Sequence, residues 1–444
     1  MPWPSTGTKH PMNATFSSLR RRCHLPWKLS ALCLLLARPL AAQQIPVPPP
    51  SASLPTGAAR DIRVGTDVKT IAEAIKTAQP GDTIHLEPKI YRDYAGFFGK
   101  KGLPGRPVTL DGHGATLEGS EPLDPAQWRA VAPGLFAADN LLPKLDDAII
   151  QRWFFLIDGR LNRMGRTSKG RTVPLKKPAE LQPGEWTFEK DPSRETPPSK
   201  QIYGTFYLKI EPGQKLTDRQ IFVPVRSAGV QLGGENAHLV IRNVTATHPY
   251  NDGFNIHGDC RDVVFENIRA IECGDDGISA HESAQYLVRG LVSCGNSTGI
   301  CDTGTSETNY ERVLIRDCVG FDLYFPAAGR YRLRDVVVRS LAQQALAVSG
   351  PEAGSCTVEM ENVWIQRASP GVDASIGKTG KLHAKRCTFE NLSFREPTRA
   401  SFEQCLLPGT SFPSPDPKGA STDMLSKMAA ELCESDQPKA GRLP

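Results

Sequence analysis

A four-residue pattern of apolar, charged, polar or small, and apolar positions recurs along the second half of the chain. It occurs as IRNV at Ile241, FENI at Phe265, VRGL at Val288, IRDC at Ile315, LRDV at Leu333, MENV at Met360, AKRC at Ala384 and FEQC at Phe402. Apolar and polar residues alternate with period two in each copy, which is typical of β-strands. No amphipathic run of ten or more residues fits between the copies, so we predict stacked coils of a parallel β-helix.

A second short strand is predicted in each coil, usually after a glycine. The copies are GFNIH at Gly253, GISAH at Gly277, GICDT at Gly299, GFDLY at Gly320, ALAVS at Ala345 and GVDAS at Gly371. Alternation turns Phe254 and Ile256 inward, and Asn255 and His257 outward. Aligning the copies on their first residue predicts two outward columns: Asn255, Ser279, Cys301, Asp322, Ala347 and Asp373, and beside it His257, His281, Thr303, Tyr324, Ser349 and Ser375.

The rest of the chain divides into segments around these coils. We predict an N-terminal cap helix (Val68–Ala78) with the first coils over residues 61–124, an inserted antiparallel β-rich module over 125–232, the main coils over 233–410, and a C-terminal cap helix (Thr422–Glu434, with Thr422 as its N-cap) with a disordered tail over 411–444. Amphipathic helices suit the ends of such a stack, because open sheet edges invite pairing with other chains. The short strands and Pro/Gly turns of 125–232 suit a small antiparallel unit.

Residues 1–42 resemble an export signal, and residues 43–60 form a Pro-rich linker. A basic region precedes the apolar stretch LSALCLLLA, and small residues follow it. That stretch is too short to span a membrane. Removing residues 1–42 takes away six of the 53 basic residues and none of the 48 acidic ones, leaving 47 against 48. We therefore expect a secreted, periplasmic or extracellular protein without a membrane span, and the basicity does not argue for nucleic acid.

Nine of the eleven cysteines follow residue 42. An odd number without a CxxC pair argues against a metal knuckle or a complete disulfide framework. Several lie at core positions of the repeat, so we expect most to be buried apolar fillers.

Two stretches near the N-terminus, QPGDTIHLEPKIYRD (79–93) and GRPVTLDGHGATLEGSEPL (105–123), resemble the opening coils of secreted right-handed parallel β-helix proteins that act on carbohydrates, the pectin lyase-like group with pectate lyases, alginate lyases and chondroitinase B. The stretch RWFFLIDGRLNRMGR (152–166) resembles the β-rich insertion of bacterial β-helix proteins classed with glycoside hydrolases. The resemblance implies an all-β right-handed solenoid with an inserted module. Such phrases recur across many activities.

The doubled phrase NDGFNIH and DDGISAH, within residues 251–283, is similar to polygalacturonases. That resemblance implies Asp252, Asp275 and Asp276 as catalytic carboxylates. It then ends: GNSTGICD (295–302) stands where the family has Gly-His-Gly, and GFDLYFP (320–326) where it has Arg-Ile-Lys. Polygalacturonase activity as such is therefore not expected.

Hydrolysis of a glycosidic bond needs one carboxyl group to protonate the leaving oxygen and another to activate water or attack the sugar. Asp252 and Asp276 hold equivalent places on adjacent coils, so we expect their Cα atoms to lie about 5 Å apart with Asp275 alongside. Charges this close separate the pKa values into an acid and a base. We predict that His257 and His281 complete the catalytic set, relaying protons or binding sugar hydroxyls. The predicted substrate-binding residues are Asn255, Ser279, Glu282, Asp322, Tyr324 and Asp373.

Other interpretations stay open at this point. Asn-Asp-Gly and Asp-Asp-Gly form turns without any substrate, and stacked histidines suit a solvated sheet. The carboxylates could bind Ca²⁺, although the spacing selects no metal. A run of basic residues could hold an anionic polysaccharide or be solvated surface; its members are Arg152, Arg160, Arg163, Arg166, Lys169 and Arg171.

We predict a monomeric glycoside hydrolase acting on a polysaccharide. A polysaccharide lyase acting on uronate-containing glycans is the first alternative, but the two outward columns hold no Lys or Arg to serve as its base. A non-catalytic glycan-binding or adhesion protein is the second.

Overall fold

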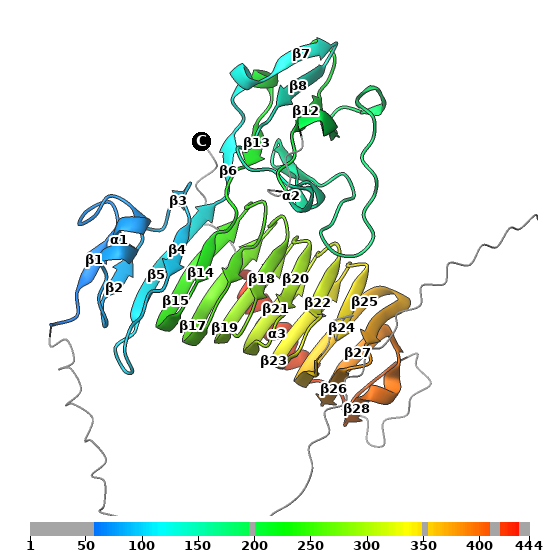
Figure 1. The fold of residues 1–444 in the computed structure, drawn as a ribbon. Helices are drawn as coiled ribbons and strands as arrows, with labels where there is room; N and C mark the ends of the chain where they lie inside the picture. The colour runs from blue at the N-terminus through cyan, green and yellow to red at the C-terminus, as the bar shows by residue number, and fades with distance from the viewer. Residues whose placement is uncertain (1–56, 195–199, 349–353, 409–417, 435–444) are drawn as a thin grey trace, which may run out of the picture. The chain divides into compact units, whose positions relative to one another are not determined.

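The computed structural model describes residues 57–194, 200–348, 354–408 and 418–434. Stacked parallel strands form its largest part (Figure 1), which confirms the prediction of a parallel β-helix. The predicted signal at 1–42, most of the linker at 43–60 and the tail beyond residue 434 lie outside the described residues.

Each central coil has one short and one long strand. The short strands are β14 (Val230–Gly233), β16 (Phe254–Ile256), β18 (Asp276–Ala280), β20 (Thr298–Asp302), β22 (Phe321–Phe325) and β24 (Gln344–Val348), and the long ones are β15 (Asn236–Thr247), β17 (Cys260–Ile271), β19 (Gln285–Cys294), β21 (Glu307–Arg316), β23 (Gly329–Ser340) and β25 (Cys356–Ile376). Each strand pairs in parallel with its counterpart one coil away. Apolar residues from successive coils fill the interior as one continuous core.

Shorter strands begin and end the stack. They are β1 (Asp61–Arg63), β2 (Thr83–His85), β3 (Ile90–Tyr91), β4 (Ala95–Phe98) and β5 (Val108–Glu118) at the start, and β26 (Gly380–Lys385), β27 (Thr388–Arg395) and β28 (Ala400–Glu403) at the finish. Short 3-10 helices lie at Pro125–Gln127, Pro178–Glu180, Pro192–Arg194, Leu216–Asp218 and Pro397–Arg399.

A left-handed residue at one equivalent position bends each long strand so that both of its halves face the core. Asn243 has φ 55°, Asn267 49° and Asp335 56°, and asparagine and aspartate tolerate this region better than most residues. These bends are the third letters of the predicted phrase. The copy assigned at Ile315 was wrong: Leu291 pairs with Val313, so the equivalent phrase is YERV at 310–313.

An antiparallel module interrupts the stack between β5 and β14. One of its sheets holds β6 (Ser120–Pro122), β9 (Phe155–Ile157), β10 (Arg160–Asn162) and β13 (Ile221–Pro224), and the other holds β7 (Arg129–Ala132), β8 (Leu135–Asp139), β11 (Trp186–Lys190) and β12 (Gly204–Lys209). With helix α2 (Asp147–Arg152) it has its own aromatic core around Trp153, Trp186 and Phe206. The predicted end at residue 232 was too late, because β14 already pairs with β4 and β16 of the stack.

Two helices were predicted as caps, and only the first packs as a cap would. Helix α1 (Ile71–Thr77), with Thr70 as its N-cap, buries Ile71 and Ile75 in the core of the first coils. Helix α3 (Thr422–Glu434) begins at Thr422 and packs against β19, β21 and β23, with Leu425 contacting a cluster that includes Leu314. It therefore covers the side of the stack, because the outer face of these strands carries apolar residues.

The described cysteines carry free thiols, and eight of the nine are buried. This confirms their predicted role as apolar fillers. Among the described residues, no helix has the length and apolar character needed to cross a membrane.

Candidate functional site

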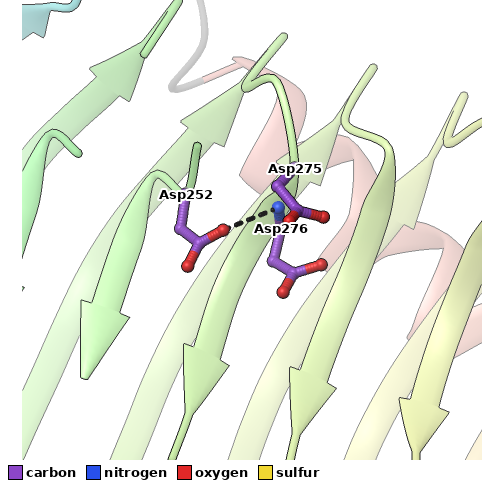
Figure 2. Close-up of side chains that lie close together, drawn as sticks. All are labelled: Asp252, Asp275 and Asp276. Atoms are coloured by element: carbon purple, nitrogen blue, oxygen red, sulfur yellow. Dashed lines mark hydrogen bonds between the residues drawn. The ribbon is translucent and has the colours of Figure 1, made fainter. Parts of the chain in front are cut away.

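Three aspartates from adjacent coils meet beside the short strands. Asp252 precedes β16, and Asp275 and Asp276 lie where β18 begins (Figure 2). An oxygen of each lies within 4.8 Å of an oxygen of the others, and all three residues are buried. The Asp276 N–H donates to Asp252 Oδ1 at 3.0 Å, and the Ser279 hydroxyl donates to Asp252 Oδ2 at 2.8 Å. The predicted proximity of these carboxyl groups is therefore present in the structure.

The cations of this cluster come from the inserted module. Lys169 Nζ lies 2.6 Å from Oδ1 of Asp275 and 2.6 Å from Oδ1 of Asp276. Arg152 Nη1 lies 3.0 Å from Asp275 Oδ2, and the Ser168 hydroxyl donates to Asp275 Oδ1. Lys169 is 106 residues from Asp275 in sequence. A lysine thus lies over the face that the sequence predicted to lack one.

The segment that carries Lys169 is held at both ends. Arg163 is buried and donates to the carbonyls of Cys273, Gly274 (2.8 Å) and Gly295 (3.0 Å). At the other end, Gln343 exchanges two hydrogen bonds with the Arg171 backbone, at 2.6 and 2.7 Å. These contacts fix the approach of Lys169 to the carboxylates.

A glycine allows the module to come this close. A Cβ at Gly274 would clash with the Tyr250 carbonyl and lie 2.9 Å from the Arg152 carbonyl oxygen. The residue before Asp275 must therefore lack a side chain for Arg152 to reach it.

The environment separates the pKa values of the three carboxyl groups. Burial alone would raise the pKa of Asp275, but Lys169 and Arg152 hold it well below its ordinary value. Burial and the charge of Asp275 raise the pKa of Asp252 to about 6, and the same two causes raise the pKa of Asp276 well above its ordinary value despite Lys169. Burial by itself would lower the pKa of Lys169, but the charges of Asp275 and Asp276 outweigh burial and raise that pKa well above its ordinary value. Lys169 is therefore a cation. The cluster therefore combines a permanently ionised carboxylate with carboxyl groups that can carry a proton.

The two predicted histidines stack beside the cluster, with ring centroids 4.1 Å apart and planes at 5°. Burial and the neighbouring His257 lower the pKa of His281 to about 4, so His281 is neutral. Glu282 is exposed and lies 3.2 Å from Nδ1 of His257. This pair offers polar atoms at the edge of the face.

The strand register changes the predicted outward columns. Cys301 pairs with Tyr324, so Tyr324 lies in the outward column of Asn255 and Ser279. The prediction that placed Asp322 in this column is wrong. Asp322 is fully buried, and burial raises its pKa to about 7. It cannot line a groove.

Other predicted substrate-binding residues are placed as follows. Asn255 and Ser279 are buried, and Oδ1 of Asn255 has no hydrogen-bond partner in the described part of the chain. Tyr324 is partly buried, with its ring centroid 4.5 Å from that of Phe321. The side chain of Asp373 lies outside what the structure describes.

The carboxylates do not suit the Ca²⁺ site considered from the sequence. Oxygen donors favour Ca²⁺, but the positive charge between Asp275 and Asp276 is already the ammonium of Lys169. Arg152 adds a second cation, so the cluster is neutralised by protein side chains.

The basic run is divided among three roles, and only its charge excess was visible in the sequence. Arg152 and Lys169 pair with the aspartates, whereas Arg163 and Arg166 donate to backbone carbonyls. Arg160 and Arg171 are exposed. Ser168 had no signal in the sequence at all.

Comparison with known proteins supports the fold. Residues 226–394 match the family model described as right handed beta helix region. No curated protein is significantly similar to the sequence. Similar solved structures include XylC in complex with xylose (12% identity, TM-score 0.49, covering 80% of this chain and 76% of that one), a glycoside hydrolase (10%, 0.37, 77% and 89%) and pectate lyase Pel9A (10%, 0.38, 83% and 83%). Similarities this low identify no reaction.

Proposed function

We propose that this chain, a right-handed parallel β-helix protein of pectin lyase-like fold, hydrolyses glycosidic bonds of a polysaccharide at the cluster of Asp252, Asp275 and Asp276. The observation that carries the proposal is the meeting of three buried carboxyl groups, with oxygens within 4.8 Å of one another, around the ammonium of Lys169. The separation of their pKa values supports it. Perturbed carboxyl groups that share a site are typical of acid and base pairs.

The roles follow from the pKa values. Asp276, whose pKa is raised well above its ordinary value, keeps its proton and serves as the acid toward the leaving oxygen. Asp252, with a pKa of about 6, is ionised above that pH and serves as the base. Asp275 stays ionised, holds Lys169 and Arg152, and raises the pKa of its neighbours. It is a positioning residue in this scheme.

The position of Lys169 defines how the substrate would enter. The side chains of Asp275 and Asp276 are 9% and 4% exposed, whereas that of Lys169 is 20% exposed. In our proposal the ammonium moves away from Asp276 when the glycan binds, and it then faces the sugar. A cation there suits an acidic sugar.

Lys169 also favours a second candidate, a polysaccharide lyase, because lyases of the resembled families use Lys or Arg as the base. Its raised pKa argues against this role, since a base must be neutral to accept the C5 proton. Hydrolysis is therefore the better supported reaction.

The test is a panel of acidic and neutral polysaccharides assayed for new reducing ends and for unsaturated ends that absorb in the ultraviolet. We expect reducing ends alone, and we expect Asp276→Asn and Asp252→Asn each to lower the rate by about 10²–10⁴. Glu311→Gln, which alters a partly exposed carboxylate on another face, is the control. Circular dichroism would verify that the variants fold.

Three results would contradict the proposal. Unsaturated ends would identify a lyase, and full activity of both aspartate variants would remove the cluster from the reaction. Glycan binding without cleavage would support the non-catalytic alternative.

A further inference from the structure

Two aromatic side chains lie exposed on the outer face of β4 and the residue before it, where β4 pairs with β14. Ala95 and Phe97 of β4 are fully buried, so alternation places Tyr94, Gly96 and Phe98 on the outer face. Tyr94 is 40% exposed and Phe98 is 61% exposed. Single exposed apolar residues are common on proteins, but two large rings on one face of one strand form a patch.

Glycines let these rings lie against the sheet. A Cβ at Gly96 would lie 2.8 Å from Cε2 of Tyr94 and 2.8 Å from Cε2 of Phe98. A Cβ at Gly233 would lie 2.9 Å from Cδ1 of Phe98. The Phe98 ring therefore spans the bare backbones of the paired strands β4 and β14, and much of its surface stays open to solvent.

This aromatic patch lies on the same face as the carboxylate cluster. Gly96 pairs with Gln231, and Gln231 pairs with Asn255, so the patch is two coils from Asn255, about 10 Å along the stack. Asn255 is the residue whose buried Oδ1 has no described partner. The aromatic patch and the unpaired amide oxygen thus lie along one line of paired residues, and Ser279, the next residue on that line, donates to Asp252.

We propose that Tyr94 and Phe98 form a stacking subsite for a pyranose ring of the same glycan that is cleaved at the aspartates. The C–H face of a pyranose is apolar and its rim is polar, which fits an open aromatic face beside unpaired polar groups. The glycan would then run along the stack, across the strands. This inference rests on the proposed function for the identity of the ligand.

The experiment measures oligosaccharide binding by calorimetry in the inactive Asp276→Asn protein, and kcat/KM in the active protein with oligosaccharides of increasing length. We expect Phe98→Ala to weaken binding of long oligosaccharides about tenfold and to leave the shortest substrates unaffected. Phe98→Trp should retain binding. Leu341→Ala, which removes a side chain that is 64% exposed elsewhere, is the matched control.

The outcomes separate this inference from the proposed function. If wild type and Phe98→Ala both cleave the glycan and show the same dependence on its length, the subsite is overturned and the proposed function stands. Binding without cleavage, lost in Phe98→Ala, supports the subsite and refutes hydrolysis. Absence of any glycan binding refutes both. A wild-type dimer that Phe98→Ala converts to a monomer would identify the patch as a contact between copies and overturn the subsite.

Discussion

Charged side chains stack on neighbouring coils in two regions of this molecule, and their partners differ. On the outer face of the long strands, acids and bases alternate coil by coil in a charge ladder: Asp111, Arg242, Glu266, Arg289, Glu311, Arg334, Glu361, Lys385 and Glu403. Its ion pairs include Arg242 with Asp111 and Arg334 with Glu311, both at 2.7 Å. In the aspartate cluster, by contrast, acid follows acid, and the cations come from the inserted module.

The difference shows how one stacking distance supports structure in one place and candidate chemistry in another. Each charge of the ladder finds an opposite charge one coil away, and most are at least partly in water, so the pairs contribute little individually. The aspartates are buried against one another, so their ionisation depends on two distant side chains. Such dependence produces the perturbed pKa values that catalysis uses.

The largest difference between the two regions is expected when one cation is removed from each. Lys169→Met should lower the free energy of unfolding by about 3–5 kcal/mol, because it removes the cation that the buried Asp275 and Asp276 share and leaves Arg152 to pair with Asp275. Arg334→Met in the ladder should change it by no more than about 1 kcal/mol, because Arg334 is exposed and Glu311 is partly so. Urea unfolding of both variants measures the difference. Equal losses would mean that the cluster is no more dependent on its cation than the ladder.

The next largest effect is expected in the pH dependence of stability, to which the buried carboxyl group of Asp252 should contribute. The pKa of Asp252 is raised from 3.8 to about 6, so between these values the folded protein binds more protons than the unfolded chain. Stability from this group is complete below about pH 4 and is lost as the pH rises toward 6. Relative to Asp252→Asn, wild type should therefore lose stability over this range, on the order of 1–3 kcal/mol. A constant difference from pH 4 to 7 would contradict the raised pKa; Glu311→Gln is the control.

A smaller effect is expected from breaking the alternation of the ladder. Glu311→Arg places like charges beside Arg289 and Arg334, which should cost about 1 kcal/mol more than Glu311→Gln. Because the site is partly exposed, 1 M NaCl should reduce the gap between the two variants. Thermal unfolding at low and high salt measures it. A gap that salt leaves unchanged would indicate a packing effect.

No effect is expected from metal removal. Lys169 and Arg152 already neutralise the cluster. EDTA should therefore change the rate of the proposed glycan cleavage by no more than about twofold, which corresponds to less than about 0.5 kcal/mol of activation free energy. Loss of activity that Ca²⁺ restores would reveal a metal that the side-chain charges do not predict.

The charge ladder shows how far a sequence pattern can be followed. The second letters of the recurring phrase alternate between base and acid, except where IRDC was chosen at Ile315. With YERV at 310–313 in its place, Glu311 restores strict alternation between Arg289 and Arg334. Charge alternation is therefore present in the sequence, and by itself it specifies the register of this coil.

The sequence by itself determined the coils, the inward apolar residues and the meeting of Asp252 with Asp276, because these depend on a period-two pattern and a repeat of one coil. Only the tertiary structure decided which surfaces helices α1 and α3 cover, that Asp322 is buried, and that Lys169 reaches Asp275 and Asp276. The physical reason is separation along the chain. A contact between residues 106 positions apart depends on how the whole module docks, and no local periodicity records that.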